Sequence, residues 1–288
     1  MQSSPALDVL LPLALALVML GLGLKLTPGD FRRVRERPRA VLTGLAVQMI
    51  LLPLVARGLA AGLPPAVGLG LMLLAASPGG PTANLYSSLA GADVALNLTL
   101  TAINSLLAIV WVPALVQLSV ASLLGSDAEI PLQTGKVVQV LTIVVVPVAI
   151  GMFARHRAPE TARRVEGPVR ALSVVVLLAL VAGLAWAYRA EIAPNVALCG
   201  LAVLAFNLAS LALGWAVPRL LGLELRQAIA ISLEIGIHNG TLAIAVALQV
   251  LQLPDATIAP ALYSLLAYFT AAATAWWGAR SLKAATPD

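Results

Sequence analysis

SPGGPTAN, residues Ser77 to Asn84, lies in the middle of an apolar segment that runs from residue 66 to residue 91. Its prolines remove backbone donors and obstruct neighbouring carbonyls, and its glycines relax the backbone, so a continuous helix is disfavoured here. A transmembrane helix that breaks at this point exposes carbonyls at the end of its first half and amides at the start of its second half. These groups suit a cation and an anion respectively. The alternative is a kink that only shapes helix packing.

EIGIHNG, residues Glu234 to Gly240, lies near the centre of a second apolar segment, residues 227–252. Arg226 marks the start of this segment, so at about 1.5 Å per residue Glu234 lies about 12 Å along the helix axis. A carboxylate at this depth is costly unless it is paired, hydrated or used, which makes Glu234 a candidate cation ligand. His238 follows one helical turn later, and the glycines favour local unwinding. A glutamate that only joins helices by hydrogen bonds is the alternative.

The composition places the rest of the chain in lipid as well. Of 288 residues, 60% are hydrophobic and only 11% are charged, and the mean hydropathy is +0.95. A soluble domain is closer to half apolar and a quarter charged. Apolar runs long enough to cross a bilayer as helices recur throughout, whereas the alternating segments of a membrane barrel are absent from the sequence. We predict an all-α polytopic membrane protein, a single transmembrane domain over residues 1–288, with about nine spans: 6–26, 40–61, 66–91, 95–123, 133–154, 171–189, 195–221, 227–252 and 257–280.

The basic residues predict the orientation of these spans. Under this division, 15 of the 18 lysine and arginine residues fall on one side. By the positive-inside rule the N-terminus is then outside and the C-terminus cytoplasmic, as expected for a multi-pass protein of the inner (plasma) membrane. The formal charge of +5 therefore reflects topology, and we expect the lipid bilayer rather than nucleic acid as the partner.

Further polar side chains lie inside predicted spans. Asn97, Thr101, Asn104 and Ser105 share one face of the fourth span. They indicate either a site or hydrogen bonding between helices. The same two interpretations remain open for two isolated residues, Gln48 in the second span and Asn207 in the seventh.

The two interrupted spans, the third and the eighth, are five spans apart, so they cross the membrane in opposite directions. This layout is typical of inverted repeats whose discontinuous helices cross at the midplane. No strong sequence identity links the two halves, so the prediction rests on hydropathy and on the breaks.

At these residues the chain resembles the bile acid:sodium symporter family, in a nine-helix form. The similar segments are GLGLKLTPGDF (residues 21–31), the Pro-Gly-Gly segment that ends at Asn84, and Glu234 to Asn239. The resemblance implies a core domain with two crossing broken helices and a panel domain. It also implies alternating-access symport of an organic anion, such as a bile acid, pantoate or a keto acid, with sodium. No enzyme activity, no cofactor other than sodium as coupling ion, and no obligate protein partner are expected.

The resemblance also implies two sodium sites, built from the hard oxygen ligands that a hard cation prefers. The first consists of Asn84, Asn97, Thr101 and Glu234. The second consists of Glu234, His238, Gln48 and the carbonyls of Ile235 and Ile237. We place the organic anion at the starts of the two second half-helices, where the predicted substrate-binding residues are Gly80, Pro81, Thr82, Asn239 and Gly240. Only sodium, and no transition metal, is expected.

Three positions depart from the family pattern. Ala83 stands where the family often has serine, Asn97 where serine is common, and His238 where glutamine is usual. Imidazole suits transition metals better than sodium, and it titrates near neutrality. A proton on His238 or Glu234 could therefore replace the second cation. This leaves a proton-coupled organic anion carrier or antiporter as the alternative function.

Overall fold

The computed structural model describes residues 5–80, 82–124, 134–187 and 189–285. Within these ranges every regular element is a helix, which confirms the all-α class. The first half contains α1 (Pro5–Gly23), α2 (Pro28–Glu36), α3 (Pro38–Ala46), the π-helical turn η1 (Val47–Leu51), α4 (Leu52–Ala60), α5 (Pro65–Ala76), α6 (Ala83–Leu89) and α7 (Val94–Leu124). The second half contains α8 (Thr134–Arg157), α9 (Pro159–Ala187), α10 (Arg189–Leu220), α11 (Leu225–Gly236), α12 (Gly240–Ala245), the π-helical turn η2 (Val246–Val250), the 3₁₀ turn η3 (Pro254–Thr257) and α13 (Ile258–Ala285).

Each predicted span overlaps one helix or a pair of half-helices, although α9 begins at Pro159, before the start of the predicted span 171–189. Among the described residues, four helices are long and apolar enough to cross a membrane without a break: Pro38–Ala60, Val94–Leu124, Cys199–Leu220 and Pro254–Ala285. Three shorter apolar helices, Pro12–Gly23, Pro65–Ala76 and Gly240–Val250, accompany them. A membrane-embedded chain follows from these lengths, while the count of nine spans and their orientation stay predictions.

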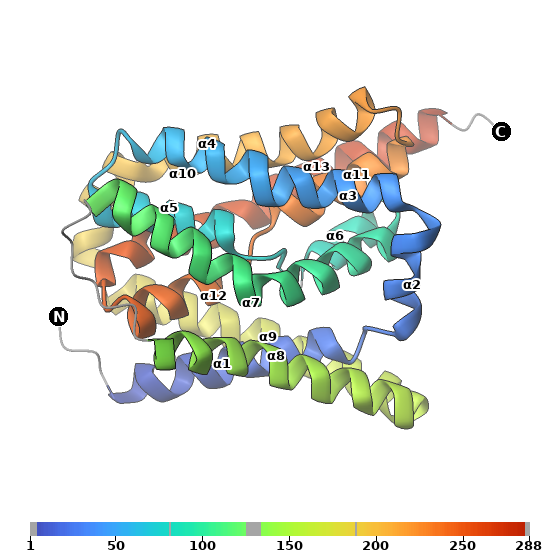
Figure 1. Cartoon of the computed structure of the whole chain (residues 1–288), viewed down its shortest axis with the longest axis horizontal. Coiled ribbons are helices and arrows are strands. Elements are labelled where there is room, and N and C mark those ends of the chain that lie inside the picture. Colours follow the sequence, from blue (N-terminus) through green and yellow to red (C-terminus); the bar gives the residue numbers. More distant parts are fainter. Residues whose placement is uncertain (1–4, 81, 125–133, 188, 286–288) are drawn as a thin grey trace.

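One helix was not predicted. The segment Pro28–Glu36, expected to be a loop, forms α2, which runs across the direction of the long helices and joins α1 to α3 (Figure 1). Arg32 and Glu36 pair at 3.0 Å on its exposed face, and Val34 packs against the core. The charged composition of this segment hid its helical spacing.

The long helices form two groups. α1, α8 and α9 pack together along one side of the molecule, at the bottom of Figure 1, and the remaining helices lie beside them. α1 and α8 approach closely because both carry glycine at their contact. A side chain at Gly23 would collide with the carbonyl of Val148, and one at Gly151 would collide with the backbone of α1. Small residues allow this backbone approach in membrane helices.

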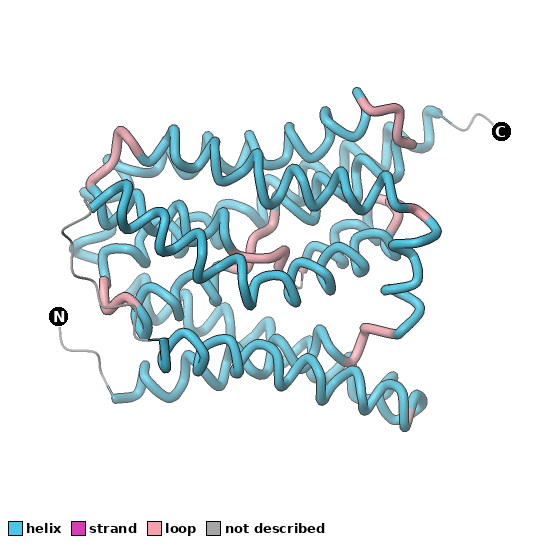
Figure 2. The backbone as a smooth tube through the Cα atoms, viewed as in Figure 1, coloured by secondary structure: helices cyan, strands magenta, loops and turns pink. Residues whose placement is uncertain are grey.

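Both predicted breaks are present, and they meet. α5 ends at Ala76 and α6 begins at Ala83, while α11 ends at Gly236 and α12 begins at Gly240. Figure 2 shows the two connecting loops in the middle of the molecule, away from the loops at the helix ends. The loops pair in antiparallel fashion at Gly79 and His238. The Gly80 amide donates to the Ile237 carbonyl at 2.5 Å, and the Asn239 amide donates to the Pro78 carbonyl at 2.9 Å. The backbone groups released by each break are thus partly satisfied by the other break.

Candidate functional site

Glu234 lies on the last turns of α11 and is completely buried. Its Oε2 accepts a hydrogen bond of 2.7 Å from the Thr101 hydroxyl of α7. Its Oε1 has no hydrogen-bond partner among the described residues. The first break touches the same carboxylate, because a Cβ added at Gly79 would collide with both oxygens of Glu234. Glycine at position 79 is therefore what allows the two broken helices to close around this group.

Asn97 fixes the helices that surround the carboxylate. Its Nδ2 donates to Ser87 Oγ of α6 and to the Ala230 carbonyl of α11, both at 2.9 Å. Since the Ala230 carbonyl can only accept, these two bonds settle which end of the amide is nitrogen. Asn97 Oδ1 remains without a partner in the described part of the chain, although Asn97 is fully buried.

Asn84 adds a third set of unpaired atoms. It lies one turn before Ser87 on α6 and is 4% exposed, yet neither its Oδ1 nor its Nδ2 has a partner among the described groups. Buried polar atoms are nearly always hydrogen-bonded, so unpaired ones need an explanation. Three buried side-chain oxygens, Glu234 Oε1, Asn97 Oδ1 and Asn84 Oδ1, thus come from three mutually packed helices. Carboxylate and amide oxygens of this kind fit a hard cation.

The residues of the second predicted sodium site are arranged differently from those of the first. Gln48, on η1, donates through Nε2 to the Ser77 carbonyl at 3.0 Å, and the same nitrogen lies 3.4 Å from His238 Nδ1. The amide nitrogen rather than the oxygen of Gln48 therefore faces the imidazole. The carbonyl of Ile237 already accepts the Gly80 amide. The structure brings Gln48 and His238 together, but this set contains two buried side-chain oxygens without a partner among the described residues, Gln48 Oε1 and Glu234 Oε1, against three in the first set.

The predicted substrate residues lie at the two breaks. The amides of Gly80 and Gly240, expected to be available, donate to the carbonyls of Ile237 and His238. Asn239 Oδ1 caps α12 by accepting the Leu242 amide at 3.0 Å, and its Nδ2 has no partner in the described residues. Thr82 is the residue before α6.

Pro81 lies outside the described residues. The placement of the anion at these positions stays a prediction.

Three buried residues beside the second break contact the site, although they were not among the predicted ion or substrate ligands. Phe206 and Tyr263 contact the imidazole of His238, and Tyr263 and Asn207 both donate to the Gly236 carbonyl. Asn207 stood out as an isolated polar residue in an apolar span. Phe206 and Tyr263 carried no such signal, because aromatic residues in apolar helices are usually packing residues.

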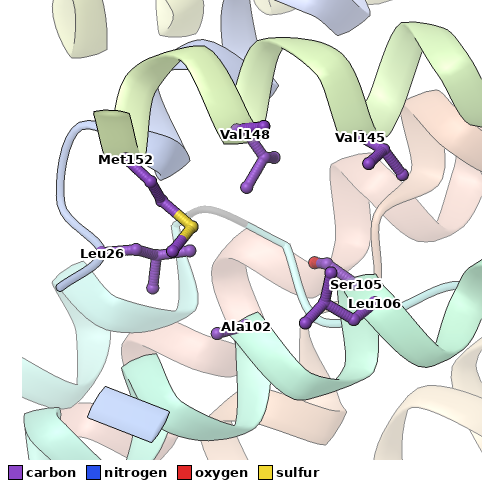
Figure 3. Close-up of a pocket in the computed structure, with 8 residues that line it drawn as sticks. Leu26, Ala102, Ser105, Leu106, Val145, Val148 and Met152 are labelled. Atoms are coloured by element: carbon purple, nitrogen blue, oxygen red, sulfur yellow. The ribbon is translucent and has the colours of Figure 1, made fainter. Parts of the chain in front are cut away.

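A cavity of about 60 Å³ lies between α8 and α7, and Figure 3 shows its lining. It is lined by Leu26, Ala102, Ser105, Leu106, Val145, Val148, Ala149 and Met152. The one polar side chain in this set, Ser105, lies one turn beyond Thr101 and donates to its carbonyl at 2.7 Å. An apolar space between the two groups of helices therefore begins one helical turn from the residue that holds Glu234.

Comparison with known proteins supports one family. A profile of the Sodium Bile acid symporter family matches residues 12–194. The uncharacterized sodium-dependent transporter YocS of Bacillus subtilis is 28% identical over 236 residues, which are 81% of this chain and 72% of the relative. The ileal sodium/bile acid cotransporter of Homo sapiens is 27% identical over 240 residues, 82% of this chain and 68% of the relative.

The P3 protein of Homo sapiens is 30% identical over 275 residues, and the match covers 92% of this chain but only 56% of that protein. The relatives whose names state an activity are transporters, so this chain is of the transporter type and not an enzyme. The profile covers more than half of the chain, including α7 with Asn97 and Thr101, and the chain therefore belongs to the sodium bile acid symporter family.

Proposed function

We propose that this protein is a sodium-coupled symporter of a small organic anion that works by alternating access, with Glu234 as the central sodium ligand. The observation that carries the proposal is the buried carboxylate at the meeting point of the two broken helices. None of the ion pairs formed by the described residues involves Glu234, and one of its oxygens is unpaired. A buried charge without a counter-charge is costly, and a bound cation removes that cost.

The first sodium site consists of Asn84, Asn97, Thr101 and Glu234. The unpaired oxygens of three of these residues support it. Thr101 holds the carboxylate through its hydroxyl, so this residue orients Glu234 as well as neighbouring the ion. Binding of sodium here links α6, α7 and α11, and thereby stabilises the meeting of the two breaks.

The second site, with Gln48, His238 and the carbonyls of Ile235 and Ile237, has weaker support. The Gln48 amide presents nitrogen to His238, and the Ile237 carbonyl is already hydrogen-bonded. These contacts favour transport with one sodium ion at the first site. They also keep the proton-coupled carrier or antiporter as the second candidate function, with Glu234 or His238 as proton carrier.

The transported solute is an organic anion. The relatives named as sodium/bile acid cotransporters support this class, and bile acids, pantoate and keto acids are the candidates. In our proposal the anion binds beside the breaks, at Gly80, Pro81, Thr82, Asn239 and Gly240. Movement of the group α1, α8 and α9, as the panel, against the remaining helices, as the core, opens the site to either side of the inner (plasma) membrane.

Sodium binding and solute uptake can be measured separately. We expect sodium, but not choline at the same ionic strength, to raise the melting temperature of the purified protein, because a ligand of the folded state stabilises it. A screen of carboxylates should then find one that adds a further shift only when sodium is present. In proteoliposomes, a sodium gradient should drive uptake of that carboxylate. Uptake that follows a proton gradient and ignores sodium would select the alternative function.

A further inference from the structure

The break between α11 and α12 is enclosed by two helices that contribute none of the proposed sodium ligands, α10 and α13. They approach the break closely because glycine stands on both sides of it. A side chain at Gly236 would collide with Leu211 of α10, and one at Gly240 would collide with Ser264 of α13. The position of the broken helix is therefore set by these two neighbours as well as by its partner break.

The carbonyl of Gly236 is the point that both neighbours hold. Carbonyls in the last turn of a helix have no partner within the helix and must find one elsewhere. Asn207 of α10 donates to Gly236 O through Nδ2 at 3.1 Å, and Tyr263 of α13 donates through its hydroxyl at 2.9 Å. Both side chains are fully buried, so water does not compete for this carbonyl.

The same neighbours contact His238, which lies within the break. The ring of Phe206, on α10, stacks on His238 with a centroid distance of 5.4 Å and an interplanar angle of 16°. Tyr263 contacts both rings, with centroid distances of 5.3 Å to His238 and 5.8 Å to Phe206. His238 is 5% exposed. Contacts from α10 and α13 thus restrain the chain both at the end of α11 and within the break.

We infer that Asn207 and Tyr263 are positioning residues for the sodium site. Gly236 follows Glu234 by two residues, so a fixed Gly236 carbonyl fixes the final turn of α11 that carries the carboxylate. With that turn held, the Glu234 carboxylate keeps the orientation in which its Oε2 accepts the Thr101 hydroxyl at 2.7 Å and its Oε1 is unpaired among the described residues. Residues that orient metal ligands in this way raise affinity because the site loses less freedom when the ion binds. This inference rests on the proposed function.

A packing role and a positioning role for the two hydrogen bonds to the Gly236 carbonyl predict different results. If the two hydrogen bonds only hold helices together, their loss lowers stability equally with and without sodium. If they orient Glu234, their loss also weakens sodium binding. The sodium dissociation constant, and not the melting temperature alone, is therefore the decisive quantity.

The test uses the full chain, purified in detergent and titrated with sodium chloride against choline chloride in a thermal-shift assay. Tyr263→Phe removes one donor to Gly236 but keeps the ring against His238, and Asn207→Leu removes the other donor. Ser119→Ala is the matched control, because it removes a buried hydroxyl that bonds only within α7, to the Leu115 carbonyl at 2.5 Å.

We expect Tyr263→Phe and Asn207→Leu each to raise the sodium dissociation constant about tenfold or more. Ser119→Ala should lower the melting temperature without sodium and leave the dissociation constant unchanged. Since each variant removes one donor to the same carbonyl, either one decides the question if the other does not fold. Wild-type sodium affinity in these variants would overturn the inference while leaving the proposed function intact. A wild-type protein that does not respond to sodium would overturn both.

Discussion

Gly79→Ala tests the contact between the two breaks most directly. The three atoms nearest to the added Cβ would be Oε1, Cδ and Oε2 of Glu234, all closer than the 3.0 Å below which real Cβ contacts essentially do not occur. The backbone at Gly79 has no positive φ, so the cost comes from this collision and not from the backbone. The carboxylate must move, and its 2.7 Å bond to Thr101 must lengthen or break.

The expected loss of stability is the sum of two contributions, the collision and the weakened hydrogen bond. Overpacking a buried site costs about 1–3 kcal/mol, and a hydrogen bond to a charged group contributes about 1.5–3 kcal/mol. We therefore expect Gly79→Ala to lower the free energy of unfolding by about 2.5–6 kcal/mol. It should also abolish stabilisation by sodium, which for the wild type is about 2.7 kcal/mol when sodium is present at 100 times its dissociation constant.

A double-mutant cycle provides the assay. The free energy of unfolding is measured in mixed detergent micelles for the wild type, Gly79→Ala, Glu234→Ala and the double variant. Because Glu234→Ala removes the obstacle, Gly79→Ala should cost less than about 1 kcal/mol in that background. Gly58→Ala is the control for the substitution itself, since apart from its own helix backbone and chain neighbours nothing lies within 4 Å of its added Cβ. Additive effects of the two substitutions, or wild-type stability of Gly79→Ala, would refute the contact on which the site is built.

Other predictions concern ion coupling, the first break and the packing of α8 against α1. Glu234→Gln should abolish stabilisation by sodium in the thermal-shift titration, and retention of the wild-type response would mean that the ion binds elsewhere. His238→Gln restores the amide usual in the family and should make the sodium dependence of uptake more cooperative; an unchanged sodium dependence in proteoliposomes would reject a coupling role for the imidazole. Gly80→Ala combined with Pro81→Ala should favour a continuous third span, so the protein should still be expressed while uptake falls sharply, and near-normal uptake would show that the break is dispensable. Gly151→Leu should destabilise the protein by about 1–3 kcal/mol, because its side chain would push α8 away from α1, and a wild-type melting temperature would contradict that close contact.

The breaks were predictable from sequence because their causes are local. Pro78 and the glycines beside it disfavour a helix whatever surrounds them, and the loop between Ala76 and Ala83 is where they predict it. The predicted spans agree with the helices for a similar reason, since partition into lipid depends on the composition of about twenty consecutive residues. α2 was missed because its charged residues gave no apolar run.

The functional site also has a part that was predictable from sequence and a part that was not. Glu234 and Asn97 stood out in the sequence because a polar group at bilayer depth is costly wherever its partners lie. Which of their oxygens stay unpaired could not be predicted, because this depends on contacts such as the one from Thr101 to Glu234, which joins residues 133 positions apart. The same holds for the Gln48 amide, whose nitrogen rather than oxygen faces His238.

The sequence alone determined that this is a membrane-embedded helical chain with two broken spans and a carboxylate at bilayer depth. These features were predictable because sterics and solvation act over a few neighbouring residues. Only the tertiary structure decided that Gly79 lies against that carboxylate, and that Asn207 and Tyr263 share the carbonyl of Gly236. These contacts join helices that are distant along the chain. They depend on how closely the helices approach and on which way each side chain turns, and both are set by packing of the whole molecule.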